Sequence, residues 1–336
     1  MKEVSFAIVG CGRIGYRHAT IVEGLEEARL VAFCDVLADY PAARAFPHVP
    51  RFVNINEMLT SDIPIDVVSV CSPNGLHAEH ALAAIAKGKH VLCEKPLALT
   101  RRDVESIIHA SLHASRKVFC VMQNRYSPPA VWLKNLIEQE LLGAIYLIEI
   151  NCYWNRDQRY YRPGDWHGTL ALDGGPLFTQ FSHFIDLVYW VFGDLRIDYA
   201  QFDRFSRNKL TEFEDSGFVA FSLVNGGKGA MHYTTAVWDK NMESSIVVIG
   251  EKGSLKIGGQ YMNEVDYCHI DRYQMPDLPP SNPPNNYGPF QGSAANHHYV
   301  IENVVESLLH QKPISTNALE GMKVVEIIER IYEWRK

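Results

Sequence analysis

Residues 6–15 read FAIVGCGRIG, an apolar run that leads directly into the glycine pattern G-x-G-x-x-G. A strand that ends in this pattern, and a helix that begins there, are typical of the dinucleotide-binding unit of a Rossmann fold. Gly10 permits the tight turn, Gly12 lets the backbone approach a pyrophosphate, and Gly15 allows close packing of helix on strand. The N-terminus of the helix then offers free N–H groups to the phosphates. This stretch therefore predicts a dinucleotide site.

An acidic residue stands where such a site needs one. Asp35 follows the predicted strand Leu30–Cys34, 20 residues after Gly15. A carboxylate at this place binds the ribose hydroxyls and repels a 2′-phosphate, and no arginine directly follows Asp35 to hold such a phosphate. NAD is therefore expected in preference to NADP.

The first 122 residues alternate apolar runs with amphipathic segments. Continuous apolar strands between helices are typical of a parallel sheet that is covered on both faces and binds ligands at the carboxyl ends of its strands. We therefore expect an α/β Rossmann domain over residues 1–122. Its predicted strands are Phe6–Val9, Leu30–Cys34, Asp66–Cys71, His90–Cys93 and Val118–Met122, and its helices are Ile14–Glu26, Ala78–Lys87 and Arg102–Ser115.

The pattern changes near Gln123. Residues 123–336 are predicted to form an α+β domain for substrate binding and oligomerisation, with a large, mostly antiparallel sheet. Asn225-Gly226-Gly227 between two apolar runs indicates a hairpin. The predicted strands are Ile145–Tyr153, Ser216–Val224, Lys228–Val237, Ser245–Gly250 and Ser254–Ile257; the helices are Pro129–Glu140, Pro176–Val191, His297–Leu309 and Ala318–Glu333, with a long loop over 276–292.

Composition and charge exclude several classes of protein. The net charge of −7 argues against a nucleic-acid binder, and no apolar run is long enough to span a membrane. No secretory signal is seen at the N-terminus, and the seven cysteines are scattered without a C-x-x-C pair. We expect reduced thiols in a cytoplasmic protein. We expect no metal site, because His77 is expected to line the nicotinamide pocket, His80 is expected on the surface of a helix, and the adjacent His297 and His298 are too local to define one.

Two polar loops follow predicted strands at the edge where a nicotinamide would lie. The first contains Ser72, Pro73 and Asn74, and the second is Glu94-Lys95-Pro96. A lysine directly after a buried strand is either a solvated loop residue or a catalytic ammonium that hydrogen-bonds a substrate hydroxyl.

These motifs carry a family resemblance. Residues 70–77 (VCSPNGLH) and 90–96 (HVLCEKP) resemble the glucose–fructose oxidoreductase / inositol dehydrogenase (Gfo/Idh/MocA) family, as does Asp173-Gly174-Gly175 before a helix with His183 and Asp186. The resemblance implies an NAD-dependent oxidoreductase acting on CH–OH groups, assembled as a homodimer or homotetramer. It also implies that Lys95 is catalytic and that His183 faces it across the cleft.

The roles of these two groups follow from their intrinsic acidity. His183 is the expected proton acceptor, because the reference pKa of histidine is near 6.5 and that of lysine near 10.4. Lys95 would orient and polarise the hydroxyl, and a desolvated Lys95 would reverse these roles. Family helices commonly begin Gly-Gly-Gly and carry Asp or Asn four residues before the histidine. This chain has Pro176 and Thr179 at those places, so Thr179 is expected to take part through its hydroxyl.

Residues 155–162, NRDQRYYR, place three arginines and two tyrosines just before that helix. Arginine forks suit phosphate or carboxylate, and aromatic faces suit a sugar or base ring; a solvated charged loop is the alternative. The expected substrate-binding residues are Lys95, Arg125, Arg156, Arg159, Tyr161, Arg162, Trp166, His167, Thr179 and His183. The expected cofactor-binding residues are Gly10, Gly12, Arg13, Ile14, Gly15, Asp35, Ser72, Pro73, Asn74, His77, Glu94, Lys95 and Gln123.

Three further segments bear on the substrate. Residues 239–245, 250–254 and 256–259 resemble the UDP-N-acetylglucosaminuronate 3-dehydrogenase branch of the family. The leading hypothesis is therefore oxidation of a ring hydroxyl in a nucleotide-linked uronic acid sugar. A dehydrogenase of a free sugar or inositol, and an inactive cofactor- or sugar-binding sensor, are the alternatives.

Overall fold

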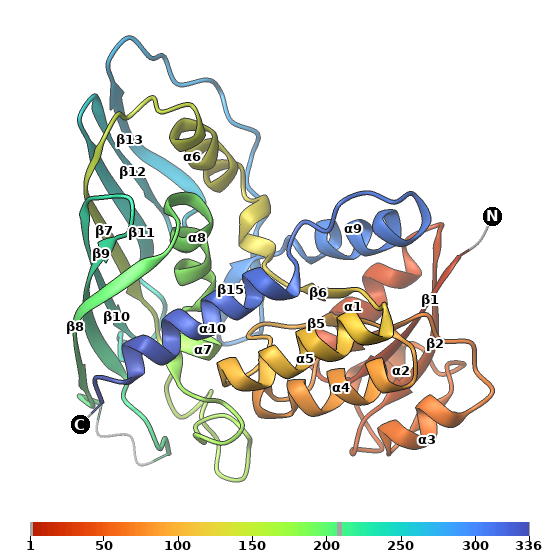
Figure 1. Ribbon diagram of the computed structural model, residues 1–336. Helices are drawn as coiled ribbons and strands as arrows, with labels where there is room; N and C mark the ends of the chain where they lie inside the picture. The colour runs from red at the N-terminus through yellow and green to blue at the C-terminus, as the bar shows by residue number, and fades with distance from the viewer. Residues whose placement is uncertain (1–2, 207–209, 336) are drawn as a thin grey trace. The chain divides into compact units, whose positions relative to one another are not determined.

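The computed structural model describes residues 3–206 and 210–335 (Figure 1). The chain divides into two compact units: Met1–Met122 with His297–Val325, and Gln123–Asn296 with Glu326–Lys336. The sequence-based division, which assigned all of residues 123–336 to the second domain, is therefore wrong for 297–325. This segment returns to the first unit because it covers that unit's core: α9 (His297–Leu309) packs on α1 (Arg13–Glu23) and β1 (Val4–Val9).

The first unit contains a six-stranded parallel sheet in the order β3-β2-β1-β4-β5-β6. The order reverses between β1 and β4, which is the place where sheets of this class bind ligands. The remaining strands are β2 Ala28–Cys34, β3 Arg51–Phe52, β4 Val67–Val70, β5 His90–Cys93 and β6 Val118–Cys120. The remaining helices are α2 Pro41–Ala45, α3 Ile55–Thr60, η1 Asn74–Leu76, α4 His77–Ala86, α5 Arg101–Ala114 and the first half of α10 Ala318–Tyr332.

The second unit contains a seven-stranded sheet in the order β13-β12-β11-β7-β10-β9-β8, in which only β7 and β10 pair in parallel. The strands are β7 Ile145–Tyr153, β8 Leu195–Asp203, β9 Ser216–Leu223, β10 Lys228–Thr234, β11 Glu243–Gly250, β12 Gly253–Gly258 and β13 Glu264–Ile270. A small ribbon, β14 Pro284–Asn286 with β15 Gln291–Ala294, begins within the segment predicted as a loop. The predicted fold class is confirmed in both units.

Helices cover one face of this sheet. Figure 1 shows α6 (Pro128–Glu138) and α8 (Ser182–Phe192) on the same side of it. Leu133 of α6 and Leu187 of α8 meet Ile246 and Ile257 of the sheet around a small apolar space. Burying such side chains contributes roughly 1.5–3 kcal/mol each. The core of this unit therefore lies between the two helices and the inner face of the sheet.

The predicted helix Pro176–Val191 is interrupted. The structure has a short α7 (Pro176–Thr179) and a separate α8. The N–H of Phe181 donates to the carbonyl of Pro176, five residues back, which widens the turn. Phe181 is fully buried and its ring packs against Trp154 and Tyr233. Tertiary packing of this aromatic side chain accompanies the break, and the new helix begins directly before His183.

The seven cysteines are free thiols, as expected, and all but Cys71 and Cys268 are buried. Among the described residues, no helix has both the length and the apolar character needed to cross a bilayer.

Candidate active site

The glycine loop of the first unit is shaped for a ligand that contacts backbone. Gly10 has φ +84°, and a Cβ there would lie 2.5 Å from the amide N of Ser72. A Cβ on Gly15 would lie 2.1 Å from the carbonyl O of Gly10. A Cβ on Gly12 would have nothing within 4 Å. Two of the glycines are thus needed for packing, while the third leaves open space at the N-terminus of α1, whose first residues are Arg13 and Ile14.

Asp35, which directly follows β2, also forms hydrogen bonds within the protein. Its Oδ2 accepts a hydrogen bond from the Cys11 N–H at 2.7 Å, and its Oδ1 accepts one from the Leu37 N–H at 2.9 Å. Each carboxylate oxygen keeps a second acceptor site for a ribose hydroxyl. The carboxylate therefore also fixes the glycine loop.

The loop after β4 is tied to α4 by histidines. The hydroxyl of Ser72 lies 2.8 Å from His80 Nδ1, so His80 is not merely the helix-surface residue that the sequence suggests. His77 is 1% exposed, with Nδ1 2.6 Å from the Pro96 carbonyl and Nε2 2.8 Å from the Ser72 carbonyl. Burial lowers the pKa of His77 although both carbonyls favour its protonated form. His77 thus joins the two loops that contain the predicted cofactor residues; Asn74 beside it is also buried.

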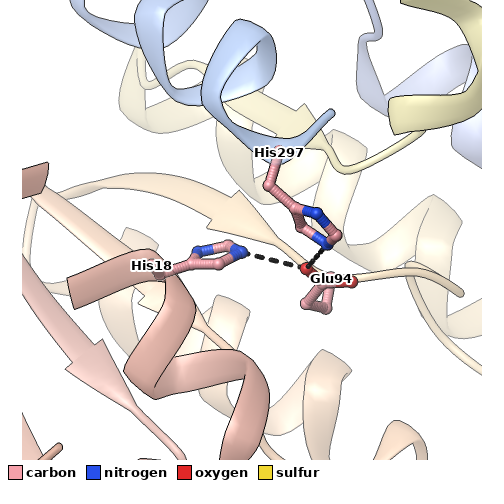
Figure 2. Close-up of side chains that lie close together, drawn as sticks. All are labelled: His18, Glu94 and His297. Atoms are coloured by element: carbon pink, nitrogen blue, oxygen red, sulfur yellow. Dashed lines mark hydrogen bonds and ion pairs between the residues drawn. The ribbon is translucent and has the colours of Figure 1, made fainter. Parts of the chain in front are cut away.

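A buried carboxylate lies directly before Lys95 (Figure 2). Glu94 Oε1 is 2.9 Å from His18 Nε2 and 3.5 Å from His297 Nε2. Burial alone would raise the pKa of Glu94, but the hydrogen bonds from His18 and His297 hold it well below its usual value. Glu94 Oε2 accepts a hydrogen bond from the Lys95 N–H at 3.3 Å. Lys95 itself is half-buried.

These three side chains are of types that bind metals. Their nearest ligand atoms all lie within 4.8 Å of one another, and no other such group is found within residues 3–206 and 210–335. The sequence did not reveal this cluster, because its members come from α1, the end of β5 and the start of α9.

In the second unit, the structure brings Gln123 to His183. Both side chains are buried, and the Gln123 amide N lies 3.2 Å from His183 Nε2. Because the amide can only donate, Nε2 of His183 is the acceptor in this contact. The predicted base therefore directs a lone pair towards the amide of Gln123, a residue that the sequence analysis placed at the cofactor.

Thr179 is paired with a carboxylate that the sequence analysis did not assign. Its hydroxyl donates to Asp173 Oδ1, and Asp173 Oδ2 accepts from the Gly168 N–H at 2.8 Å. Asp173 is completely buried, which raises its pKa. The carboxylate that position 179 lacks is thus supplied beside it. The only sequence signal was the place of Asp173 before two glycines.

Arg125, an expected substrate-binding residue, forms a buried ion pair. Its Nε donates to Asp186 Oδ2 at 2.9 Å and its Nη2 to Asp186 Oδ1 at 2.6 Å. Both side chains are at most 3% exposed. The guanidinium fork is therefore occupied by the neighbouring helix α8.

The three arginines of residues 155–162 differ in their surroundings. Arg156 is buried against Trp154, and its guanidinium donates to Asn241 Oδ1 and to the Gln291 carbonyl. Burial lowers the pKa of Arg156. Arg159 pairs with Asp157 at 2.7 Å and with Asp239 at 3.3 Å. Arg162 is exposed, and its Nε donates to the Arg159 carbonyl. The structure therefore leaves mainly Arg162 oriented towards solvent.

The aromatic residues nearby also differ. Tyr161 is 2% exposed, and burial raises its pKa. Trp166 stacks on His167 with ring centroids 3.8 Å apart, and both are half-buried. His167 lies 3.0 Å from Asp165 and holds the pKa of that carboxyl below its usual value. The Trp166–His167 stack is thus a partly exposed aromatic surface, whereas Tyr161 belongs to the core.

Both units of the chain match models of one known protein family. The family described as "Oxidoreductase family, NAD-binding Rossmann fold" matches residues 4–122, and the "GFO/IDH/MocA C-terminal domain" matches residues 131–256. The chain belongs to the Gfo/Idh/MocA family and is an NAD-dependent oxidoreductase. The resemblance inferred from the sequence is confirmed, and so is the expected cofactor.

Individual relatives act on sugars and inositols. Glucose-6-phosphate 3-dehydrogenase of Bacillus subtilis is 25% identical over 99% of this chain and 96% of its own. Inositol 2-dehydrogenase of Salmonella typhimurium is 29% identical over 65% of this chain and 63% of its own. The WlbA dehydrogenase from Bordetella pertussis, solved in complex with NADH and UDP-GlcNAcA, has a TM-score of 0.88 and 29% identity, covering 99% of this chain and 96% of its own.

Proposed function

We propose that this protein oxidises a ring hydroxyl of an anionic sugar with NAD, and that the sugar is a nucleotide-linked uronic acid of the UDP-N-acetylglucosaminuronate type. The observation that carries this proposal is the whole-chain likeness to WlbA, whose structure holds NADH and UDP-GlcNAcA. The retained Lys95 and His183 support an enzyme over an inactive sensor.

The chemistry requires a hydride to leave the carbinol carbon while the hydroxyl loses its proton. NAD, when bound, supplies the hydride acceptor. His183 takes the proton, because histidine has an intrinsic pKa that suits a base near neutral pH. Its Nε2 lone pair, which meets the Gln123 amide in the structure, would exchange that contact for the substrate hydroxyl. Lys95 donates a hydrogen bond to the hydroxyl oxygen and stabilises the alkoxide that forms. Thr179 and Asp173 support α8 from the preceding turn.

In the first unit, the proposed cofactor contacts divide by chemistry. Gly10, Gly12 and Gly15 shape the backbone for the pyrophosphate, and Asp35 binds the ribose hydroxyls. The two loops joined by His77 lie at the carboxyl ends of β4 and β5, where the nicotinamide binds in sheets of this order.

Anion recognition is proposed for Arg162, with the Trp166–His167 stack as a face for a planar or sugar ring. Arg162 is the most exposed cation of its segment. Arg156 and Arg159 have roles in holding this segment together, because their guanidinium groups already donate to protein acceptors.

A substrate panel tests the proposal. NADH formation is measured with UDP-N-acetylglucosaminuronic acid, other UDP-sugars, glucose 6-phosphate, free uronic acids, inositols and neutral hexoses. We expect the highest kcat/KM with the UDP-linked uronic acid. Activity confined to inositols or neutral sugars would establish the second enzyme hypothesis instead, and binding of NAD without turnover of any compound would establish the sensor.

We also propose that the protein is a cytoplasmic homodimer or homotetramer. The face of the seven-stranded sheet opposite α6 and α8 bears exposed apolar residues, among them Leu147 and Ile249. A sheet face without its own helices is a natural place for a second subunit. Light scattering during size exclusion tests this, with Leu147→Glu as the disrupting variant.

A further inference from the structure

We propose that His18 and His297 are positioning residues, which hold the backbone at Lys95 through the carboxylate of Glu94. This inference rests on the proposed catalytic role of Lys95. It starts from an unusual arrangement: the imidazoles of two distant helices, α1 and α9, meet at one oxygen of a buried carboxylate (Figure 2).

The second oxygen of that carboxylate connects the cluster to Lys95. Glu94 Oε1 accepts from both histidines, while Oε2 accepts from the main-chain N–H of Lys95. The ring of His18 is fixed from its other side, since its Nδ1 lies 2.7 Å from the hydroxyl of Ser69 on the neighbouring strand β4. The carboxylate is thus held from two elements and reaches the peptide that carries the lysine.

The other side of Lys95 has an anchor of the same kind. The Pro96 carbonyl lies 2.6 Å from Nδ1 of the buried His77. Three buried histidines therefore act near this lysine, two through Glu94 on the Glu94–Lys95 peptide and one on the Pro96–Leu97 peptide, one residue beyond Lys95. The long, flexible lysine side chain gains a defined origin when its backbone is held on both sides.

The energetics favour a role beyond stability. Removing a carboxylate from water costs several kcal/mol, which its partners offset only when the geometry is good. An apolar side chain would fill the same place without that cost. The hydrogen bonds keep Glu94 ionised, since they hold its pKa well below the usual value despite burial. An ionised acceptor makes a stronger hydrogen bond to the Lys95 N–H than a neutral one would.

We interpret the contacts of this cluster as hydrogen bonds. The 2.9 Å between His18 Nε2 and Glu94 Oε1 is the length of an N–H···O bond, in which His18 donates. In a metal site the two lone pairs would instead be directed at an ion about 2.0–2.2 Å from each atom. Filling such a site would require both protons to leave.

The decisive comparison uses two adjacent histidines of α9. His297→Phe removes the donor to Glu94 with little change of shape, and His298→Phe makes the same change at a half-buried neighbour. We expect kcat to fall about tenfold or more in His297→Phe, while the Kd for NAD stays within about twofold. His298→Phe should retain wild-type kcat. His297→Gln, whose amide can still donate, should recover most of the loss.

Two further measurements distinguish positioning from a general loss of structure. The pH profile of kcat should shift in His297→Phe, because a displaced Lys95 changes the pKa values of the groups around the substrate hydroxyl. Glu94→Gln keeps the volume but turns an NH₂ group towards the Lys95 N–H, so it should lose kcat to the same degree; it replaces His297→Phe if that variant does not fold.

The outcomes separate this inference from the proposed function. If Lys95→Met is inactive but both His297→Phe and Glu94→Gln keep wild-type kcat and pH profile, the positioning role is wrong and the dehydrogenase mechanism stands. If Lys95→Met is fully active, the catalytic assignment itself fails. If EDTA abolishes the wild-type activity and Zn²⁺ restores it, the cluster is a metal site and the hydrogen-bond interpretation is overturned.

Discussion

The glycine loop of the first unit and the arginine segment 155–162 of the second were both expected to bind negatively charged groups. In the glycine loop, the position that matters remains open, because a Cβ on Gly12 would touch nothing within 4 Å. In the arginine segment, the guanidinium groups of Arg156 and Arg159 are each bonded to two side chains or carbonyls of the protein, and the exposed Arg162 donates to the Arg159 carbonyl. The backbone of the glycine loop thus leaves space for a ligand, whereas the charged side chains of the arginine segment form contacts that stabilise the fold.

This difference follows from how each kind of site is specified. Glycines at fixed spacing determine the path of the backbone, and the N–H groups of a helix N-terminus have no intrahelical partners to satisfy them. A guanidinium has five donors on a flexible stem and takes whichever acceptors the fold supplies. Substitutions at both kinds of site test which side chains bind a ligand and which only stabilise the fold.

The largest effect is expected at the buried pair of Arg125 and Asp186. Asp186→Asn should lower the free energy of unfolding by about 3–5 kcal/mol, because it leaves a buried guanidinium without its counter-charge. Urea unfolding measures this. Glu105→Gln, in the exposed pair with Arg101, is the matched control and should cost at most about 1 kcal/mol. Equal small effects, together with a raised KM, would show that Arg125 serves the substrate instead.

Lys95→Met and His183→Ala should each lower kcat by about 10²-fold or more, the usual scale for a positioned acid or base. The Kd for NAD should stay near the wild-type value. Lys87→Met and His109→Ala, at exposed positions of the first unit, are the matched controls. A fully active Lys95→Met would remove its catalytic assignment, and an unchanged His183→Ala would make Lys95 the candidate base.

Features that depend on local spacing were predictable, and features that depend on distant partners were not. The parallel strands of the first unit follow from apolar runs between helices. The strand β3 and the helices α2 and α3 were missed because two to six residues are too few to show a periodicity. The return of residues 297–325 to the first unit leaves no mark in the local pattern.

The same limit applies within the candidate site. Arg156 is bonded to Asn241 and Gln291, which are 85 and 135 residues further along the chain. Glu94 meets His297 in the same way. The motif Glu94-Lys95-Pro96 marked the loop, but the partners that hold it come from tertiary structure alone.

Asp35 has features of both kinds of site, because its charged side chain is expected to bind the cofactor and also accepts a hydrogen bond from the glycine loop. Asp35→Ser should weaken NAD binding about 10- to 100-fold, the equivalent of one hydrogen bond to a charged group, and should improve NADP relative to NAD. Asp35→Asn is the control, because it keeps an acceptor for the Cys11 N–H but loses the charge. Fluorescence titration with both cofactors measures the ratio. A wild type that prefers NADP would contradict the assignment.

Acid should destabilise the protein through its buried histidines. Burial lowers the pKa of His77 and His297, so each ring takes up its proton at lower pH in the folded protein than in the unfolded chain, where protonation begins near pH 6.5. The unfolded state then binds more protons, and the free energy of unfolding falls by at most about 1.4 kcal/mol per pH unit for each such ring. The pKa of Glu94 is lowered in the folded protein, so its ionised carboxylate stabilises the fold at neutral pH. This stabilisation is lost only below the ordinary pKa of glutamate, near 4.3.

Urea unfolding at pH 7.5, 6.5 and 5.5 measures this dependence. His297→Phe should show a shallower loss of stability between pH 6.5 and 5.5 than the wild type, because one of the titrating rings is gone. His109→Phe, at an exposed position, should keep the wild-type slope. An identical slope in His297→Phe would mean that this ring is protonated in the folded protein.

The smallest effect, and the one that most directly tests the second unit, concerns Arg162. An exposed guanidinium contributes roughly 0.2–1 kcal/mol to a charge pair, so Arg162→Ala should raise KM for a UDP-linked uronic acid by no more than about fivefold. Arg159→Ala should change KM less, because Asp157 and Asp239 already neutralise that side chain. Exposed charges are screened within about 8–10 Å at physiological ionic strength, so added salt should raise the wild-type KM and reduce its difference from Arg162→Ala. Initial rates at low and high salt measure both effects. Turnover confined to neutral sugars, and insensitive to salt and to alanine at all three arginines, would end the anionic-substrate proposal and leave the dehydrogenase assignment in place.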